Sequence, residues 1–270
     1  MSPPAPEITL ASRSGKGQRG QNEDSLRLGH CRTGWYAVVA DGAGGHLKGA
    51  EASQRSVQLI ESLLQDAEDS AFHPETLSGI VRAAHAELQR LQVPGNPAAS
   101  MHTTVVVLWV DRSMRRALWA HVGDSRLYRL RQGLVDLVTT DDSVVQQMIS
   151  AGLISSAAAR QHPHKNQLIA ALGVQGEIDP HTVVRPVELR AGDAFLLCSD
   201  GWWDSLNALS IATTLETSRF ADAWLAAMEQ LIDARKAPRQ DNYSAVAVWI
   251  GHPALAVGAP SEETVPLSRR

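Results

Sequence analysis

The residues of this chain best suited to catalysis or metal binding are acidic residues at the ends of apolar segments. Asp41 ends the apolar run of residues 35–40 and is followed by Gly42, Gly44 and Gly45. An ionised carboxylate at the end of a buried strand is costly unless it reaches water or a cation. A turn is the ordinary interpretation of one Asp-Gly pair, and a metal site is the alternative. A metal site requires further carboxylates elsewhere in the chain.

Such carboxylates occur at four more expected strand ends. They are Glu23 with Asp24, then Asp124, then Asp200, and finally Asp241. Each alone is also typical of a turn, so their joint pattern decides the interpretation. Hard divalent cations prefer carboxylate, carbonyl and water oxygens. Because no cysteine or histidine is needed in this set, it favours manganese or magnesium over zinc.

A phosphate-binding loop is a second interpretation of a strand followed by glycines and a helix. The dinucleotide pattern needs glycine where Leu47 stands, and the P-loop needs Ser or Thr after Lys48, where Gly49 stands. Asp41 would also repel a phosphate unless a cation lay between them. The sequence therefore disfavours this interpretation.

Composition excludes several classes of protein. The chain has 270 residues, 44% of them hydrophobic and 20% charged, with a formal net charge of -4, so it offers no basic stripe for nucleic acid. Cys31 and Cys198 are too few for a disulfide framework, which indicates reduced thiols. Neither a signal peptide nor a membrane-spanning apolar run is visible. We expect a cytoplasmic protein without membrane insertion.

The expected elements are strands grouped with strands and helices arriving in pairs. One helix begins at Leu47 and another near Glu75, and a third covers residues 220–232 with Phe220, Ala223, Trp224, Ala227 and Leu231 on its apolar face. Strands are expected at residues 8–12, 35–40, 103–110, 116–122, 126–130, 183–189, 193–198 and 244–250. This grouping favours antiparallel sheets covered by helices.

The chain divides into one domain with two loose ends. Residues 1–7 are proline-rich and expected to be disordered, residues 8–250 form the domain, and residues 251–270 form a flexible tail. Within the domain, residues 141–173 are broken at Gly152, Pro163 and Gly173. We interpret this stretch as a mobile flap.

Five motifs in order carry a family resemblance. They read Arg19-x-x-Asn22-Glu23-Asp24, Asp41-Gly42-x-Gly44-Gly45, Gly123-Asp124-Ser125-Arg126, Ser199-Asp200-Gly201-Trp202-Trp203-Asp204 and Asp241-Asn242-Tyr243-Ser244. Their order and spacing resemble the metal-dependent serine/threonine protein phosphatases of the type 2C family in its compact bacterial form. The resemblance covers about residues 8–250. It implies an α+β fold, a four-layer α-β-β-α sandwich with two antiparallel sheets flanked by helix pairs.

The resemblance also implies an activity and a set of site residues. The activity is hydrolysis of phosphoserine and phosphothreonine in proteins, by attack of a hydroxide that bridges two Mn2+ or Mg2+ ions. Asp41 would bridge these ions, the Gly42 carbonyl would bind the second, and Asp200 and Asp241 would complete the first. Glu23 and Asp24 would hold metal-bound waters, and Asp124 would bind a weaker third ion with Asp200. Arg19 would bind the phosphate. Asn242 and Asp204 would support the site.

Two histidine positions depart from the family pattern. Some members have a histidine after the central Asp-Gly, where Ala43 stands here, so we expect a metal-bound water rather than His46 to protonate the leaving group. His102 replaces a glycine before the Thr103-Thr104 pair, and nothing in the sequence explains it. His121, within a strand, is expected to be a core histidine.

Compact members of the family usually oppose a serine/threonine kinase. The resemblance therefore implies phosphorylated proteins as partners, including such a kinase and its substrates, and we expect a monomer. A noncatalytic module that only binds phosphoprotein is the alternative, which the retention of every acidic position disfavours. A serine hydrolase is a third possibility, but the nucleophile elbow needs glycine where Leu127 stands.

Overall fold

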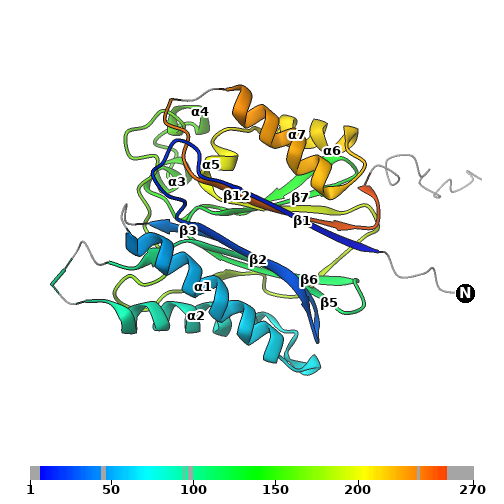
Figure 1. The fold of residues 1–270 in the computed structure, drawn as a ribbon, viewed down its shortest axis with the longest axis horizontal. Coiled ribbons are helices and arrows are strands. Elements are labelled where there is room, and N and C mark those ends of the chain that lie inside the picture. The colour runs from blue at the N-terminus through cyan, green and yellow to red at the C-terminus, as the bar shows by residue number, and fades with distance from the viewer. Residues whose placement is uncertain (1–6, 44–46, 94, 97–99, 236–237, 254–270) are drawn as a thin grey trace, which may run out of the picture.

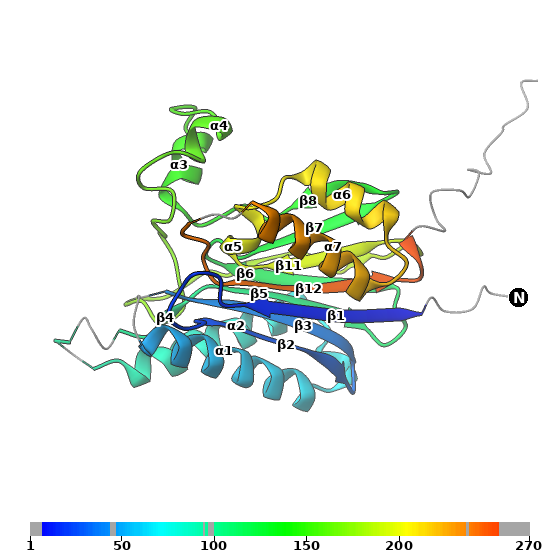
Figure 2. The ribbon, with the colours of Figure 1, turned by 45° about the horizontal axis from the view of Figure 1, so that its top comes forward.

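The computed structural model describes residues 7–43, 47–93, 95–96, 100–235 and 238–253. Two antiparallel sheets stack face to face, and a pair of helices covers the outer face of each (Figures 1 and 2). The four-layer α-β-β-α sandwich expected from the sequence is confirmed. Within the described part of the chain, no helix is long and apolar enough to cross a membrane.

The smaller sheet contains five strands. Their order is β1 (Ile8–Gly15), β12 (Tyr243–Ile250), β11 (Ala194–Cys198), β7 (Arg126–Arg131) and β8 (Leu134–Val138). Helices α6 (Ala208–Thr217) and α7 (Ala221–Ala234) cover its outer face. Trp224 and Met228 of α7 pack there against residues such as Leu196 and Trp249 of the sheet.

The larger sheet contains seven strands. The main order is β10 (Val187–Glu188), β6 (Arg116–Val122), β5 (Val105–Asp111), β3 (Gly34–Ala43) and β2 (Asp24–Cys31), while β4 (His102–Thr103) pairs with β3 and β9 (His181–Thr182) pairs with β6. Helices α1 (Leu47–Asp66) and α2 (Pro74–Leu91) cover its outer face, with the short 3-10 helix η1 (Asp69–Ala71) between them.

Three short helices lie toward one end of the sandwich. Helix α5 (Asp200–Trp203) follows β11, whereas α3 (Val144–Ser150) and α4 (Ser156–Ala159) belong to the stretch interpreted as a flap. Figure 2 shows α3 and α4 projecting from the end of the sandwich where α5 lies. The flap is thus broken into short helical pieces, as its glycines and proline predicted.

The alternation of side chains along β3 positions the acidic end of that strand. Val38 and Ala40 pack toward the helices, whereas Ala37 and Val39 pack into the layer between the sheets. Because successive strand residues point to opposite faces, Asp41 continues the row that faces the other sheet. The central motif therefore ends at the rim of the core between the sheets.

Two predicted elements differ in the structure. Residues 183–189 do not form one strand: Val183 to Pro186 is irregular between β9 and β10, because a proline cannot donate a hydrogen bond to the ladder. In α7 the buried residues are Ala221, Trp224, Leu225, Met228 and Ile232. Phe220 is instead 68% exposed and Leu231 is 41% exposed, so the predicted apolar face was wrong by about one residue, or roughly 100° of helical rotation.

Strands β2 and β8 and helices α5 and α6 were not predicted from the sequence. The predicted disordered start and flexible tail lie outside the described residues, except for Glu7 and residues 251–253. His46 lies outside them too.

Candidate metal centre and substrate cleft

Asp41 is anchored through its backbone to two threonines. The Thr103 hydroxyl and the Thr104 amide both donate to the Asp41 carbonyl at 2.8 Å, and the Asp41 amide donates to Thr104 Oγ1 at 3.1 Å. Thr104 Oγ1 also lies 2.7 Å from Ser125 Oγ in the Gly-Asp-Ser-Arg loop. Sequence reasoning did not assign Thr104 a role. The available signal was a polar pair at the start of an otherwise apolar strand.

Asp24 lies beside Asp41 because the register of β2 and β3 pairs these two residues. Ser199 Oγ donates to Asp24 Oδ2 at 2.7 Å and accepts from the Ser244 amide at 3.0 Å. These bonds connect β2 in the larger sheet to β11 and β12 in the smaller one. Both sheets thus contribute to one acidic edge.

Asp200 and Asp241 belong to two loops in direct contact. A Cβ atom on Gly201 would lie only 2.0 Å from the Asn242 carbonyl, so the residue after Asp200 must be small. The Asn242 side chain accepts from the Glu23 amide at 2.9 Å and donates to the carbonyls of Lys16 and Gln21. Asn242 therefore holds the loop of Glu23 against the loop of Asp241.

Gly42 lies where the end of β3 meets the start of α1. A Cβ on Gly42 would lie 2.3 Å from the Gly49 carbonyl, and a Cβ on Gly49 would lie 2.5 Å from Glu23 Oε2. A larger residue at Gly42 would force the two backbones apart, whereas one at Gly49 would displace the Glu23 carboxylate. This contact also brings the Glu23 carboxylate to the acidic edge.

The carboxyl groups at this edge favour protonation or a bound cation. Burial, together with repulsion from neighbouring carboxylates, raises the pKa of Asp24 to about 6 and that of Asp124 to about 7. The pKa values of Asp41 and Asp200 are also raised, first by burial and then by repulsion from neighbouring aspartates, with Asp24 the strongest for Asp41 and Asp124 the strongest for Asp200. Asp41 and Asp200 retain some exposed surface, but their carboxyl groups are enclosed.

The donor set fits hard divalent cations. Asp24 Oδ1 and Asp200 Oδ1 are buried oxygens without a hydrogen-bond partner, and a buried unpaired carboxylate oxygen is costly. In the part of the chain that the structure describes, however, no three acidic, histidine or cysteine side chains are arranged around one ion position. Both carboxylate oxygens of Asp241 are engaged by protein groups instead: Oδ1 accepts from the Asn242 amide at 2.8 Å and Oδ2 accepts from Arg19 at 2.6 Å.

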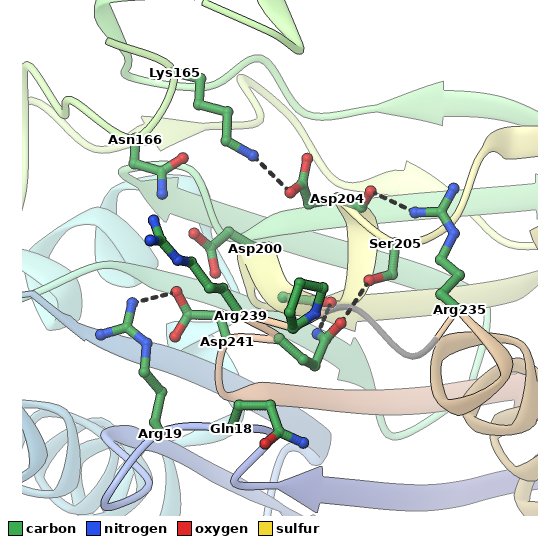
Figure 3. Close-up of a pocket in the computed structure, with 13 residues that line it drawn as sticks. Gln18, Arg19, Lys165, Asn166, Asp200, Asp204, Ser205, Arg235, Arg239 and Asp241 are labelled. Carbon is green, nitrogen blue, oxygen red and sulfur yellow. Dashed lines mark hydrogen bonds and ion pairs between the residues drawn. The ribbon is translucent and has the colours of Figure 1, made fainter. Parts of the chain in front are cut away.

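A cleft of about 650 Å³ opens beside the acidic edge (Figure 3). It is lined by Gln18, Arg19, Lys165, Asn166, Asp200, Gly201, Asp204, Ser205, Arg235, Pro238, Arg239, Gln240 and Asp241. Arg19, expected to bind phosphate, lies in this cleft but pairs with Asp241. Asp204, expected to support the site, pairs with Lys165 of the flap at 2.7 Å, a contact that sequence reasoning did not foresee.

Asp124 is held near the cleft by Trp203. The indole Nε1 donates to the Asp124 carbonyl at 2.9 Å, and the Arg126 guanidinium stacks 3.6 Å from the ring centroid. Arg126 also makes a two-pronged ion pair with Asp141, at the start of the flap. Trp202 is fully buried and packs in the core beneath the smaller sheet's helices.

His102 and His121 lie outside the group of carboxylates at the acidic edge. His102 pairs with Ala43 across β4 and β3, and burial lowers its pKa. His121 is buried, as expected, and its Nε2 lies 2.8 Å from the Thr140 carbonyl, but its Nδ1 has no partner. Neither residue supplies a ligand to the acidic edge.

The fold and this edge place the chain among two-sheet α-β-β-α sandwiches whose acidic rim suits divalent cations. The family profile described as Protein phosphatase 2C matches residues 12–241, and the chain belongs to this family.

Relatives of known structure and name agree with the assignment. The chain is 32% identical to the serine/threonine phosphatase stp of Listeria monocytogenes over 185 residues, covering 67% of this chain and 72% of stp. It is 34% identical over 217 residues to PstP of Mycobacterium tuberculosis, covering 80% of this chain but only 40% of PstP. A crystal structure of that phosphatase superposes with a TM-score of 0.79 at 31% identity, covering 91% of this chain and 99% of that one.

A further structure bears on the metals. The catalytic domain of PstP in complex with two manganese ions matches 90% of this chain and 98% of its own, with a TM-score of 0.77 and 29% identity.

Proposed function

We propose that this protein hydrolyses phosphoserine and phosphothreonine in proteins and depends on divalent metal ions. One observation carries the proposal: carboxylates from both sheets converge on a rim that opens into a cleft containing an arginine. Membership of the protein phosphatase 2C family and the names of the relatives support the same activity.

The residues that would hold the ions are those at the acidic edge. Asp41, Asp200 and Asp241 with the Gly42 carbonyl would hold two Mn2+ or Mg2+ ions, Glu23 and Asp24 would orient their waters, and Asp124 would hold a weaker third ion with Asp200. When bound, these ions would activate a water for attack on phosphorus. The two manganese ions of the PstP structure support the metal dependence for that protein.

The protein's own contribution is positioning. Thr103 and Thr104 fix the backbone of Asp41, and Ser199 orients the Asp24 carboxylate. Placing reacting groups within a few tenths of an ångström is a large part of catalysis, and these hydroxyls supply it without touching substrate.

Arg19 would bind the substrate phosphate. It contacts Asp241 through Nη2 alone, and its side chain is 55% exposed in the cleft. The planar guanidinium offers further N–H groups to phosphate oxygens in a geometry that a lysine lacks. A positive group in the cleft would also attract the negatively charged phosphate.

The biological setting that we propose is antagonism of a serine/threonine kinase in the cytoplasm by a monomeric phosphatase. The support is the resemblance of the compact chain to bacterial phosphatases of this family.

Release of phosphate from a phosphothreonine peptide tests the function. We expect turnover with manganese, loss of turnover with a chelator, and loss in Asp41→Asn. Asp179→Asn is the matched control, because Asp179 is almost fully exposed and does not line the cleft. Peptide binding without phosphate release at any manganese concentration would instead identify a noncatalytic phosphoprotein-binding module.

A further inference from the structure

The cleft holds more positive charge than its carboxylates neutralise. Arg19 pairs with Asp241 and Lys165 pairs with Asp204, while Asp200 belongs to the acidic edge. Among the described residues that line the cleft, Arg235 and Arg239 are the cations with no carboxylate within ion-pair distance. Both are exposed, and both come from the segment between α7 and Asp241.

Gln240, the residue after Arg239, is held in place by three hydrogen bonds. Gln240 Nε2 donates to the Gly201 carbonyl at 3.0 Å, Gln240 Oε1 accepts from Ser205 at 3.2 Å, and the Gln240 carbonyl accepts from the Gln18 amide. On the other side, Arg235 Nη1 donates to the Asp204 carbonyl at 3.1 Å. Figure 3 shows Arg239 on the side of the cleft near Arg19 and Arg235 on the side near Ser205.

A purely structural role explains the positive charge of Arg235 but not that of Arg239. Arg235 is the C-cap residue of α7, where a positive charge is favoured by the helix dipole. Arg239 lies beyond the helix and gains nothing from it. Two guanidinium groups without a carboxylate partner, on two sides of a cleft that Arg19 also lines, are suited to bind anionic oxygens.

We propose that Arg239 and Arg235, one on each side of the cleft, bind carboxylates or a second phosphate next to the phosphoresidue, so that this protein prefers acidic phosphopeptides. The inference rests on the proposed function, because it names the substrate class of the same cleft. The distinction from Arg19 is one of role: Arg19 lies beside the acidic edge and would bind the phosphate that is removed.

Three phosphothreonine peptides of equal length test this preference. One carries aspartates beside the phosphothreonine, one carries asparagines there, and one carries a second phosphothreonine. Because exposed charge pairs contribute modestly, we expect about five- to tenfold higher kcat/KM for the anionic peptides than for the neutral one, mainly through KM. Preference for either anionic peptide supports the inference and identifies the anion.

Variants assign the preference to residues. Arg235→Gln with Arg239→Gln should bring the ratio of kcat/KM values close to one, and the corresponding lysine pair should restore part of it. Arg112→Gln with Arg185→Gln is the matched control, because it removes the same charge from two exposed arginines outside the cleft and should keep the ratio.

Two results would overturn the inference: equal kcat/KM for all three peptides in the wild type, or an unchanged ratio in the glutamine pair. Failure of the wild type to release phosphate from any peptide would instead refute the proposed function.

Discussion

Thr104→Val tests whether the buried hydroxyl shell positions Asp41. Valine has nearly the same shape, so the substitution removes the hydroxyl with little change in volume. It leaves the Asp41 amide without its acceptor and Ser125, which is 1% exposed, without its hydroxyl partner. An orphaned buried polar group costs about 1–3 kcal/mol, so the two together should lower the free energy of unfolding by about 2–6 kcal/mol.

Thermal unfolding of the chelated protein measures this effect. For a domain of this size about 2–4 °C is lost per kcal/mol, so the Tm should fall by roughly 4 °C or more. With manganese added, turnover should also decrease, because Asp41 is no longer held at the rim.

Thr213→Val provides the control. Thr213 is exposed on α6, and the hydrogen bond recorded for it uses its backbone carbonyl, so its Tm and turnover should stay near those of the wild type. A Thr104→Val protein with unchanged Tm and unchanged turnover would refute the positioning role of this hydroxyl.

Two further predictions concern the acidic edge. The raised pKa values of Asp24, about 6, and Asp124, about 7, exceed the ordinary value of 3.8, so the folded chelated protein binds more protons than the unfolded chain between about pH 4 and 7. Its free energy of unfolding should therefore fall as pH rises through this window, so the Tm should be lower at pH 8 than at pH 5.5. Manganese should reduce this difference. A Tm that rises with pH would contradict the raised pKa values of these carboxyl groups. Asp124→Ala should retain two manganese ions by elemental analysis but turn over more slowly, and full activity in that variant would exclude a role for a third ion.

Helix α7 shows what a periodic pattern of apolar residues can predict and what it cannot. The segment was recognised from its apolar residues, yet the face built on Phe220 and Leu231 was wrong. Two overlapping sets of apolar residues fit a helical repeat, and only packing against β1 and β12 selects the set with Trp224 and Met228. Local pattern therefore establishes that a helix exists more securely than which side it buries.

The sequence itself determined the order of the acidic motifs and their oxygen-only chemistry. It also determined the grouping of strands with strands and of helices in pairs. These features depend on residue types and on short spacings, which local physics can interpret. The grouping predicted antiparallel sheets covered by helices, and the family resemblance implied the four-layer sandwich, which is confirmed.

Only the tertiary structure decided how the motifs meet. Ser199 donates to Asp24 across 175 residues of sequence, and Arg19 pairs with Asp241 across 222. No local pattern reports such contacts, because they depend on the register of β2 with β3 and on the stacking of the two sheets. The same holds for Arg235 and Arg239, whose place in the cleft arises from the packing of their segment against Gly201 and Ser205.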